Sequence, residues 1–398
     1  MSEEKLVPKL RFSGFNDEWE SYKLGDILTF YSTNSFSREK LNYKSGSVKN
    51  IHYGDIHTKY PTIVSLQDNS EVPFINDDVD LSKFKEDQYL CDGDLIIADA
   101  SEDYNDIGKA IEVKDIGDEK VLAGLHTILA RDEKNITVNG FKAELFSTNN
   151  LKTKIKIIAN GISVLGISKN NLSKLEVKIP SKNEQNKIVN FIEVMDRKIV
   201  LLEKKHKYYQ DFKMYLMQQI FTQKLRFDFV EVKLKDISKI NKGEQLNKDV
   251  MIEDGKYYVL NGGKDPSGYT NEWNVSENTI TISEGGNSCG YVNFNTEKFW
   301  SGGHCYYLSN LDENVDDYYL YNYLKFKEKF IMHLRVGSGL PNIQKRDIEN
   351  IKIQIISKNN QNKISNLFLF VDKKINSIQI QKENFENFKK GLLQQMFV

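Results

Sequence analysis

The sequence predicts an α+β fold in which two mainly β domains are separated by two long helices that pair as an antiparallel coiled coil, with a pseudo-twofold internal repeat. Three observations lead to this prediction. The chain contains an ungapped internal repeat, each copy has the apolar periodicity of a long helix, and each helix follows a region of short β-type runs. The predicted segments are a first β domain at 1–180, a first helical region at 181–226, a second β domain at 227–356 and a second helical region at 357–398.

The two β domains resemble each other at several places along the sequence. The run at residues 19–27 (WESYKLGDI) matches the run at 229–237 (FVEVKLKDI), and residues 94–98 match residues 278–282. These short β-branched and aromatic runs are broken by Gly, Asn and Asp, as is typical of strands joined by turns. We therefore expect a related, mainly β core in both domains, with more divergent loops.

Polar loops follow the matched strand-like runs at 94–98 and 278–282. The first loop covers residues 99–108 and the second 283–290. Farther along, His126 and His304 fall at matching places in the two domains. For these histidines, a framework role with a hydrogen bond beside a strand is favoured over a contact with DNA, and a catalytic role is the least favoured.

The two helical regions belong to the internal repeat. Residues 161–221 align without a gap onto residues 337–397, and about one position in three is identical. In both copies apolar residues recur at steps of three and four, which places them on one stripe, the seam of a coiled coil. The predicted seam consists of Ile188, Met195, Ile199, Leu202, Ile364, Val371, Ile375 and Ile378.

The start of each helix carries a capping signal. Ser181 and Glu184 have the spacing of a capping box, whereas Asn360 stands at the place of Glu184 in the second copy. About 40 residues of helix give a rod of roughly 60 Å. A helix with one apolar stripe needs a partner, and antiparallel pairing of the two copies is the predicted solution. The alternative is that each helix packs separately on its own domain.

Composition and charge narrow the possible locations and partners. The net charge of −1 gives no general support for nucleic-acid binding, but Lys and Arg outnumber Asp and Glu by ten to five in residues 182–226 and by fourteen to six in residues 323–398. The three cysteines (Cys91, Cys289 and Cys305) have no CxxC spacing. The N-terminus lacks the apolar stretch of a signal peptide. We expect a cytoplasmic protein without a membrane segment.

Motifs for catalysis are missing from the sequence. No two prolines are adjacent, which excludes the Asp/Asn-Pro-Pro-aromatic motif of amino-methyltransferases, and the sequence has neither a dinucleotide fingerprint nor a P-loop. Asp103 with Glu112 and Lys114 imitates a nuclease pattern, but Glu-Val-Lys recurs at Glu176 and Glu231, as ordinary strand alternation would produce. The histidines have no metal-ligand spacing. We expect no catalytic residue, metal site or cofactor in this chain.

Two motifs resemble those of a known family. Residues 8–15 (PKLRFSGF), followed by Trp19 and the run KLGDI at 23–27, look like the N-terminus of the specificity (S) subunits of type I restriction-modification systems. Residues 337–343 (GSGLPNI), which precede a strand and a Ser-x-x-x-Gln helix start, are similar to the recurring boundary motif of this family. The resemblance covers the whole chain.

The resemblance implies a non-catalytic subunit with two target-recognition domains that read a bipartite site in double-stranded DNA. Two methylation (M) subunits with S-adenosylmethionine would dock around the helices, and restriction (R) subunits with ATP and Mg²⁺ would join from outside. Two departures from the pattern concern local turns: Leu165 stands at the place of Pro341, and Ile356 at that of Pro180. The rival interpretations are a DNA-acting enzyme of a fused restriction system and a scaffold protein with two modules that do not bind DNA.

The predicted DNA contacts are loop residues that have groups able to reach base edges or phosphates. In the first domain they are Ser101, Asn105 and Lys109, and in the second Lys264, Ser267, Tyr269, Asn287 and Ser288. The turn at Gly337 and Ser338, with Asn342 and Lys345, offers backbone amides and a cation to a phosphate.

Overall fold

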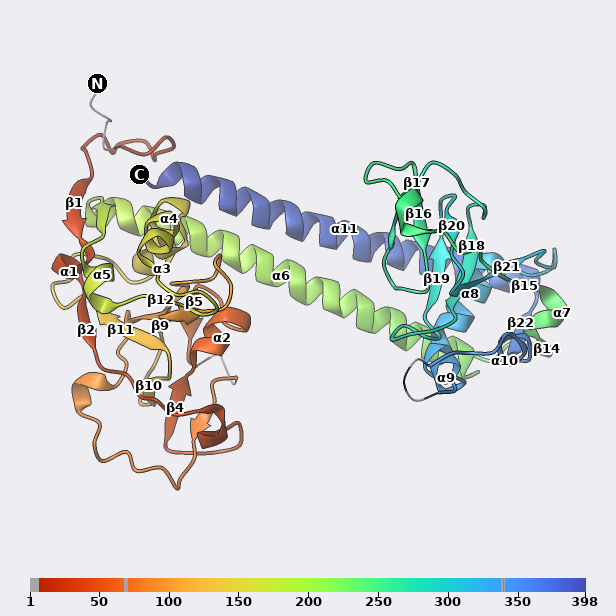
Figure 1. Cartoon of the computed structure of the whole chain (residues 1–398), viewed down its shortest axis with the longest axis horizontal. Coiled ribbons are helices and arrows are strands. Elements are labelled where there is room, and N and C mark those ends of the chain that lie inside the picture. Colours follow the sequence, from red (N-terminus) through yellow and green to blue (C-terminus); the bar gives the residue numbers. More distant parts are fainter. Residues whose placement is uncertain (1–6, 68–70, 338, 340) are drawn as a thin grey trace. The chain divides into compact units, whose positions relative to one another are not determined.

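The computed structural model describes residues 7–67, 71–337, 339 and 341–398, which form two compact units (Figure 1). Unit 1 consists of Met1–Val200 with Lys382–Val398, and unit 2 of Leu201–Gln381. The division between the units passes through both long helices. Helix α6 (Lys182–Phe221) gives its first half to unit 1 and its second half to unit 2, and α11 (Lys358–Met396) does the reverse.

A five-stranded sheet forms the centre of unit 1. Its strand order is β2 (Thr29–Tyr31), β11 (Thr127–Arg131), β7 (Leu95–Ala98), β9 (Ala110–Lys114) and β5 (Ile63–Ser65). Strand β7 contains no polar residue and is buried on both faces, as expected for a central strand. Its odd-numbered residues join the core formed by α3 (Phe141–Ser147) and α4 (Asn149–Ile158), and its even-numbered residues join a second core on the opposite face.

Smaller elements complete unit 1. A four-stranded sheet has the order β10 (Lys120–Ala123), β4 (Val48–Ile51), β6 (Phe74–Ile75) and β3 (Leu41–Asn42), and β8 (Ala100–Ser101) pairs with β12 (Leu165–Gly166). Strand β1 (Glu20–Lys23) pairs antiparallel with β13 (Glu176–Ile179). The short helices are α1 (Leu24–Ile27), η1 (Arg38–Lys40), α2 (Tyr53–Thr58), η2 (Glu86–Gln88) and α5 (Lys169–Ser173).

Unit 2 is built in the same way from fewer strands. One sheet has the order β15 (Lys239–Lys242), β21 (Cys305–Ser309), β18 (Thr279–Ser283) and β19 (Val292–Asn295), and a second has the order β17 (Gly268–Thr270), β16 (Tyr257–Leu260) and β20 (Trp300–Ser301). Strand β14 (Phe229–Lys233) pairs with β22 (Lys352–Ile356). The helices are α7 (Leu234–Ile237), η3 (Lys248–Val250), α8 (Asp317–Phe326), α9 (Glu328–His333) and α10 (Lys345–Glu349).

The two units share one strand topology. The order β2-β11-β7-β9 in unit 1 corresponds to β15-β21-β18-β19 in unit 2, and the parallel pair of β4 and β10 corresponds to the parallel pair of β16 and β20. The antiparallel pair of β1 and β13 corresponds to that of β14 and β22. The predicted fold of two related, mainly β domains with long helices is confirmed.

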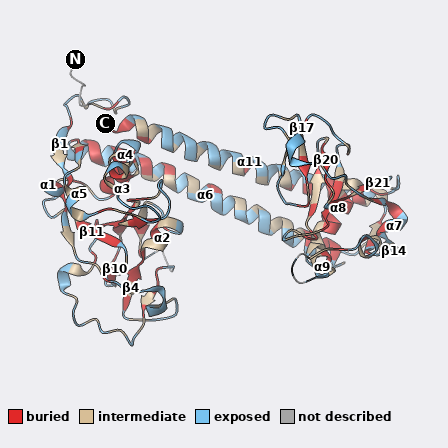
Figure 2. Cartoon of the chain, viewed as in Figure 1, coloured by how far each residue is buried: buried red, intermediate tan, exposed pale blue. Residues whose placement is uncertain are grey.

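The long helices pack antiparallel within each unit. In unit 1, Ile188 at the start of α6 shares a core with Leu393 and Met396 at the end of α11. In unit 2, Phe221 at the end of α6 lies 6.0 Å, ring centroid to centroid, from Phe368 near the start of α11. Figure 2 shows that buried positions on both helices alternate with exposed ones. The predicted antiparallel coiled coil is confirmed, and separate packing of each helix on its own domain is excluded.

One ion pair between the helices occurs twice. In unit 1 the Lys389 ammonium donates to the Asp196 carboxylate at 2.7 Å, and in unit 2 the Lys213 ammonium donates to Asp372 at 2.7 Å. The sequence repeat relates Asp196 to Asp372 and Lys213 to Lys389. Because each helix supplies one acid and one lysine, antiparallel pairing satisfies all four charges, and parallel pairing would place like residues opposite each other.

Burial along the predicted seam is uneven. Six of the eight residues are buried: Ile188, Met195, Leu202, Ile364, Val371 and Ile378. The other two, Ile199 and Ile375, occupy equivalent positions in the repeat and are only partly buried. The helix pair is therefore open to water at these two places.

The predicted capping box at the start of α6 forms only in part. The Ser181 hydroxyl accepts a 3.4 Å hydrogen bond from the Glu184 N–H, but the Glu184 carboxylate does not return to the cap. It binds the Arg11 guanidinium instead, with two contacts of 2.7 and 2.8 Å. The N-terminal motif at residues 8–15 is thereby tied to the start of α6, an interaction that local spacing does not reveal.

A buried glutamine fixes the start of each long helix. The Gln185 side chain donates to the carbonyl oxygens of Pro180 and Ile136 at 2.9 and 3.1 Å and accepts a 2.8 Å bond from the Val138 N–H. Gln361 makes the equivalent three bonds in unit 2. Three satisfied hydrogen bonds allow each amide to be buried without an unpaired group, and they join the strand-to-helix turn to a loop of the β domain.

We expect the buried and the partly exposed positions of the helix pair to respond differently to a charge. Val371→Asp places an unpaired carboxylate at a site with 1% exposure and should lower the free energy of unfolding by about 3–5 kcal/mol. The matched variant Ile375→Asp, about one helical turn away, keeps access to water and should lose only about 1 kcal/mol. Chemical denaturation measures both values. Equal losses would contradict the assignment of Val371 to the buried seam.

Glu144 in unit 1 is a buried carboxylate that accepts no hydrogen bond from the residues that the structure describes. Both side-chain oxygens of Glu144 in α3 are buried, neither accepts a hydrogen bond from a described residue, and the nearest ammonium, that of Lys389, is 3.5 Å away. Burial raises the pKa of Glu144 to about 7, an effect that the charge of Lys389 opposes. At the equivalent place in α8, four residues after the N-cap, unit 2 has the buried residue Leu320.

We predict that Glu144→Leu stabilises unit 1 at pH 8 by about 1–3 kcal/mol, because a buried carboxylate whose ammonium partner, that of Lys389, is 3.5 Å away is replaced by an apolar side chain. The folded-state pKa lies above the ordinary value of 4.5, so the folded state holds the proton more tightly. Stability contributed by this group is therefore present below pH 4.5 and is lost as the pH rises to about 7. Thermal unfolding of both proteins between pH 5 and 8 tests this: the difference between them should grow with pH. A constant difference would contradict the prediction.

Candidate nucleic-acid interface

Three loops meet at one end of the sheets in unit 1. They are residues 52–53 after β4, residues 99–108 after β7, and the turn 124–126 between β10 and β11. The Asp99 N–H donates to the His126 carbonyl at 3.1 Å, and the Gly124 N–H donates to the Ile51 carbonyl at 2.8 Å. These backbone bonds hold the three loops together.

The same three loops meet in unit 2. They are residues 261–267 after β16, residues 284–290 after β18, and the turn 302–304 between β20 and β21. The Glu284 N–H donates to the His304 carbonyl at 2.9 Å, and the Gly302 N–H donates to the Leu260 carbonyl at 2.7 Å. We call these groups the strand-end loops of each unit. They have the same backbone connections and differ in sequence.

An aromatic and imidazole cluster lies at the strand-end loops of unit 1 and on the adjoining helix α2. The Tyr53 ring packs against those of His52, His57 and His126, with centroid distances of 4.8, 6.0 and 5.2 Å. Three of the six histidines of the chain therefore gather here. Burial and the charge of Arg38 lower the pKa of His52. His52, Tyr53 and His57 are not among the residues predicted from the sequence, where their only signal is two histidines close together in one short stretch.

The predicted DNA-contact residues of unit 1 differ in how far their side chains are free to contact a ligand. Ser101 is buried, and its hydroxyl donates to the Asp103 carbonyl at 2.8 Å and accepts from the Asp103 N–H. The Lys109 ammonium donates to the His57 carbonyl at 2.7 Å. Asn105 is exposed, and its side-chain oxygen accepts a 2.9 Å bond from Lys156. Ser101 and Lys109 thus help to hold the loops, and Asn105 is the most accessible of the three.

The predicted residues of unit 2 lie mostly on the surface. Lys264 is exposed above the Tyr291 ring, and Tyr269 on β17 is 43% exposed. The Ser267 hydroxyl donates to the Val259 carbonyl at 3.2 Å. Asn287 is exposed, and its side chain forms no hydrogen bond with any other residue that the structure describes, whereas Ser288 is partly buried.

The predicted phosphate-binding turn is only partly described. Gly337 has a φ of 99°, a left-handed conformation that suits glycine, and Ser338 lies outside the described residues. The backbone of Asn342 pairs with Val336 through bonds of 2.9 and 3.0 Å. Its buried side-chain oxygen has no partner among the described residues. The turn is thus held against the strand-end loop at Gly285, with which Asn342 forms a bridge.

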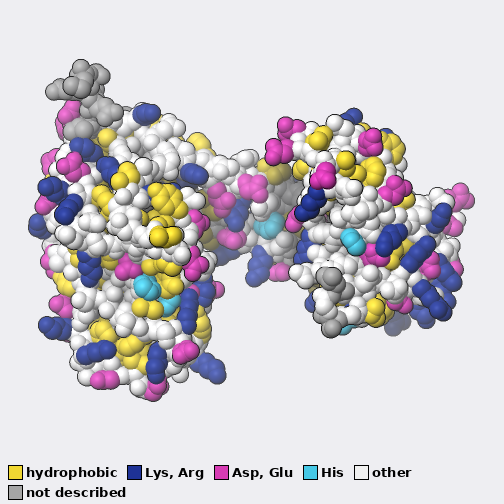
Figure 3. Space-filling view, viewed as in Figure 1, with side chains coloured by type: hydrophobic (Ala, Val, Ile, Leu, Met, Phe, Trp, Pro, Cys, Tyr) yellow, Lys and Arg dark blue, Asp and Glu magenta, His cyan; other side chains and the backbone are white. Residues whose placement is uncertain are grey.

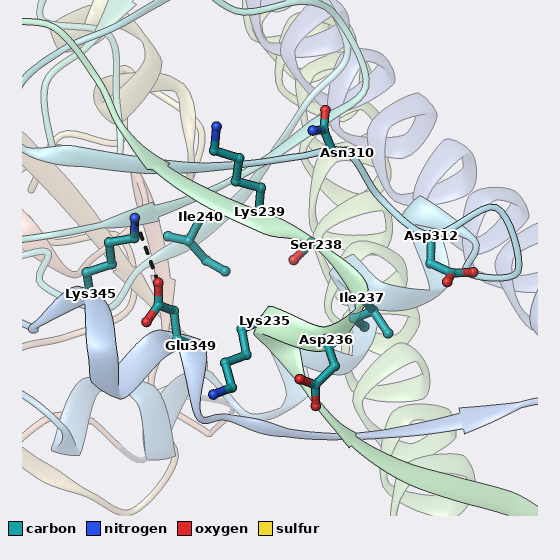
Figure 4. A pocket seen from close by; sticks show the side chains of 10 residues that line it. All are labelled: Lys235, Asp236, Ile237, Ser238, Lys239, Ile240, Asn310, Asp312, Lys345 and Glu349. Atoms are coloured by element: carbon teal, nitrogen blue, oxygen red, sulfur yellow. Dashed lines mark ion pairs between the residues drawn. The ribbon is translucent and has the colours of Figure 1, made fainter.

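Lys345 lies in a surface hollow of unit 2 (Figure 4). Its ammonium is 3.7 Å from the Glu349 carboxylate. The charged residues that line the hollow are Lys235, Lys239, Lys345, Asp236, Asp312 and Glu349. Because acids and lysines are equal in number, the hollow does not favour an anion. Figure 3 likewise shows acidic and basic side chains interspersed on the visible face of both units.

Glu112 of the nuclease-like pattern supports the start of α3. Glu112 is buried, pairs with Lys142 at 3.0 Å, and accepts hydrogen bonds from the N–H groups of Gly140 and Ala143 at the start of α3. Burial raises the pKa of Glu112. Within the part of the chain that the structure describes, no group of three or more His, Cys, Asp or Glu residues could hold a metal ion, and no helix is long and apolar enough to cross a membrane.

A family comparison decides between the interpretations of the sequence. The family model described as type I restriction modification DNA specificity domain matches residues 16–208 and 227–385. The chain belongs to this family. The resemblance to type I specificity subunits, drawn from residues 8–15 and 337–343, is therefore confirmed.

Individual relatives and solved structures agree with the family. A putative type I specificity subunit of Mycoplasma pneumoniae, S.MpnORF638P, is 37% identical over 124 residues, 31% of this chain and 33% of the relative. The corresponding protein of Mycoplasma genitalium, S.MgeORF438P, is 34% identical over 141 residues, 35% of this chain and 37% of the relative. The chain thus matches about a third of the length of each. The putative type I restriction enzyme MjaX specificity subunit of Methanocaldococcus jannaschii is 22% identical over 426 residues, covering 98% of this chain and 95% of the relative.

Two solved structures show the same fold. The type I restriction-modification S subunit from M. genitalium has a TM-score of 0.64 at 17% identity, covering 98% of this chain and 99% of the other. A chain from a structural study of assembly and conformational transition in the type I R-M system has a TM-score of 0.56 at 15% identity, covering 95% and 97%.

The difference between engaged and free loop residues has a measurable consequence. Ser101→Ala removes both bonds of a buried hydroxyl and should lower the free energy of unfolding by about 1–2 kcal/mol. Asn287→Ala removes an exposed side-chain amide that forms no hydrogen bond with the described residues, and it should change the free energy of unfolding by less than about 0.5 kcal/mol. Denaturant titration of both variants checks this. A larger loss in Asn287→Ala would mean that its amide supports the fold and is not free to contact a ligand.

Proposed function

We propose that this chain is the non-catalytic DNA-specificity subunit of a type I restriction-modification complex, in which each unit reads one half of a bipartite site in double-stranded DNA. The observation that carries the proposal is the duplication of the strand-end loops. They occupy equivalent places on one shared framework and present different side chains, such as Asn105 and Tyr53 in unit 1 and Lys264 and Asn287 in unit 2.

Bipartite recognition has a physical basis. Base pairs are distinguished mainly by the edges they present in the major groove, which faces a given side of the duplex once per turn. Two loop groups joined by helices can therefore contact two short words and leave the base pairs between them unread. In this proposal, α6 and α11 set the distance between the two half-sites, and the strand-end loops determine the base sequence that is read in each half-site.

Exposed apolar side chains on the helices support a partner that binds twice. In unit 1, Phe191 and Val194 of α6 are 37% and 58% exposed, and in unit 2 the equivalent residues of α11, Leu367 and Phe370, are 39% and 58% exposed. Repeated apolar surface of this kind suits two copies of one protein. We propose that these copies are the methylation subunits.

The proposal assigns catalysis to the partners. The methylation subunits would hold S-adenosylmethionine, and the restriction subunits would bring ATP and Mg²⁺. Since this chain lacks the proline pair of amino-methyltransferases and a P-loop, the rigorously purified chain should not methylate DNA by itself.

The test is the methylated sequence in cells. Methylome sequencing of cells with and without the gene should reveal one bipartite sequence that disappears on deletion. If deletion of the gene removes no methylated sequence from a strain whose methylation subunit is active, the proposal is contradicted.

The elements that both units share define which residues can be exchanged to change one half of the DNA site at a time. Replacing residues 28–167 by those of a relative keeps β1, α1, α5 and β13, which hold the loops to the helices, and should change one half of the methylated sequence. The matched exchange of residues 238–343 keeps the equivalent elements of unit 2 and should change only the other half. Methylome sequencing of both chimaeras gives the answer. A chimaera that alters both halves would show that recognition is shared between the units.

A further inference from the structure

We infer that His126 and His304 form a duplicated phosphate contact: each binds a backbone phosphate of the DNA as an imidazolium ion supported by a carboxylate. The inference rests on the proposed function. Such a contact would position the DNA duplex and would not depend on the base sequence that each unit reads.

A histidine lies beside a carboxylate in each group of strand-end loops. In unit 1 the His126 Nδ1 is 3.4 Å from the Asp99 carboxylate, and in unit 2 the His304 Nδ1 is 3.7 Å from the Glu284 carboxylate. The backbone at His126 has a φ of 54°, a left-handed conformation that few residues other than glycine adopt. Such conformations gather at functional sites, where the surrounding structure holds them.

The two pairs are equivalent in the fold. Each acid directly follows an inner strand of its sheet, β7 or β18, and each histidine stands in the turn before the strand that pairs with it, β11 or β21. The acid's N–H donates to the histidine's carbonyl in both units. The acid's own carbonyl accepts from the N–H of Ile167 in unit 1 and of Ile343 in unit 2, which are related by the sequence repeat.

Equivalence in two units that read different words points to a sequence-independent contact. A side chain that specified a base would be expected to differ between the units, as the other loop residues do. The phosphate backbone is the part of the DNA that both half-sites have in common. A purely structural histidine is disfavoured by exposure, because the side chains of His126 and His304 are 51% and 63% exposed.

Phosphate binding by such a pair requires the imidazolium form of the histidine. An ionised carboxylate only accepts hydrogen bonds, so it favours a proton on the facing Nδ1. In the neutral ring Nε2 is then an acceptor and cannot bind a phosphate. In the imidazolium Nε2–H is a charged donor that can. Phosphate binding at each histidine is therefore coupled to uptake of a proton.

The surrounding charges leave room for an anion. In unit 2 the Glu284 carboxylate is already compensated by Lys242 at 2.6 Å and by the Tyr306 hydroxyl at 3.0 Å, and one of its oxygens has no hydrogen-bond partner among the described residues. A protonated His304 therefore adds a net positive charge.

The charged groups around His126 likewise leave a net positive charge in unit 1 when this histidine is protonated. Asp99 faces the charges of His126 and Lys169, and burial raises its pKa. His52 and Tyr53 are the other titratable groups next to His126, and the Arg38 guanidinium behind them is paired with Asp55 at 2.8 Å. A protonated His126 beside Asp99 and Lys169 thus leaves one positive charge uncompensated.

The experiment measures affinity against pH. The full chain, in complex with the methylation subunits of its own system, is titrated with a duplex that contains the methylated sequence and with one that lacks it, between pH 6 and pH 8. Affinity of the wild type should fall as the pH rises, since histidine changes charge in this range. His126→Gln and His304→Gln should each weaken binding at pH 6 by about tenfold, by the same factor on both duplexes. The methylated sequence should not change.

Two further variants make the result decisive. His333→Gln, in α9 and outside the strand-end loops, is the matched control and should leave the affinity and its pH dependence as in the wild type. His304→Arg should restore binding with a permanent cation and remove the contribution of this site to the pH dependence. Rescue by arginine identifies a phosphate contact even if His304→Gln lowers stability.

The outcomes that overturn the inference are distinct. A relaxed or altered methylated sequence in either histidine variant would show that the side chain reads a base. Unchanged affinity in both would leave a framework role. Absence of selective binding by the wild-type complex would refute the proposed function itself, a result independent of the histidine variants.

Discussion

The structure depends on antiparallel packing of the two long helices, because neither β domain has a complete core without both of them. Unit 1 is closed by the last residues of the chain: Phe397 stacks on Phe141 at 5.4 Å and meets Trp19 at 5.9 Å. Unit 2 is closed in the same way by Phe221, which packs against Tyr319 and Tyr323. Each domain therefore requires residues from distant parts of the sequence, and its stability is coupled to the pairing of the helices.

The duplication explains why one interaction can serve in both units. The internal repeat relates the ion pair of Asp196 and Lys389 to the ion pair of Asp372 and Lys213. The same arrangement of one acid and one lysine is therefore used twice. The glutamines at the helix starts follow the same rule. Some interactions are not duplicated, such as the bond of Arg11 to Glu184, for which Asn360 offers no counterpart carboxylate.

The helix pair could be predicted from the sequence because its signal is local: a period of three and four residues, read twice. The half-buried state of Ile199 and Ile375 could not, because periodicity marks a stripe but does not report how closely the partner approaches. The strand-end loops were predicted in part, since polar loops follow apolar runs. The cluster of Tyr53 with His126 depends on parallel pairing of β4 with β10, strands about 70 residues apart, and no local pattern encodes that contact. Sequence likewise cannot separate a serine engaged within its loop, as Ser101 is, from a free amide such as that of Asn287.

These observations together separate the residues that hold the fold from those that can change without disturbing it. The residues that hold the fold, which are the helix seam, the ion pairs, the buried glutamines and the pairs of β1 with β13 and of β14 with β22, lie in the framework that the two units share. The residues that differ lie in the strand-end loops, where an exposed side chain such as that of Lys264 can be replaced without leaving a buried group unpaired. Replacing exposed loop residues therefore alters the surface of a unit at little cost to stability, and it leaves the exposed apolar side chains of Val194 and Phe370 on the helices unchanged.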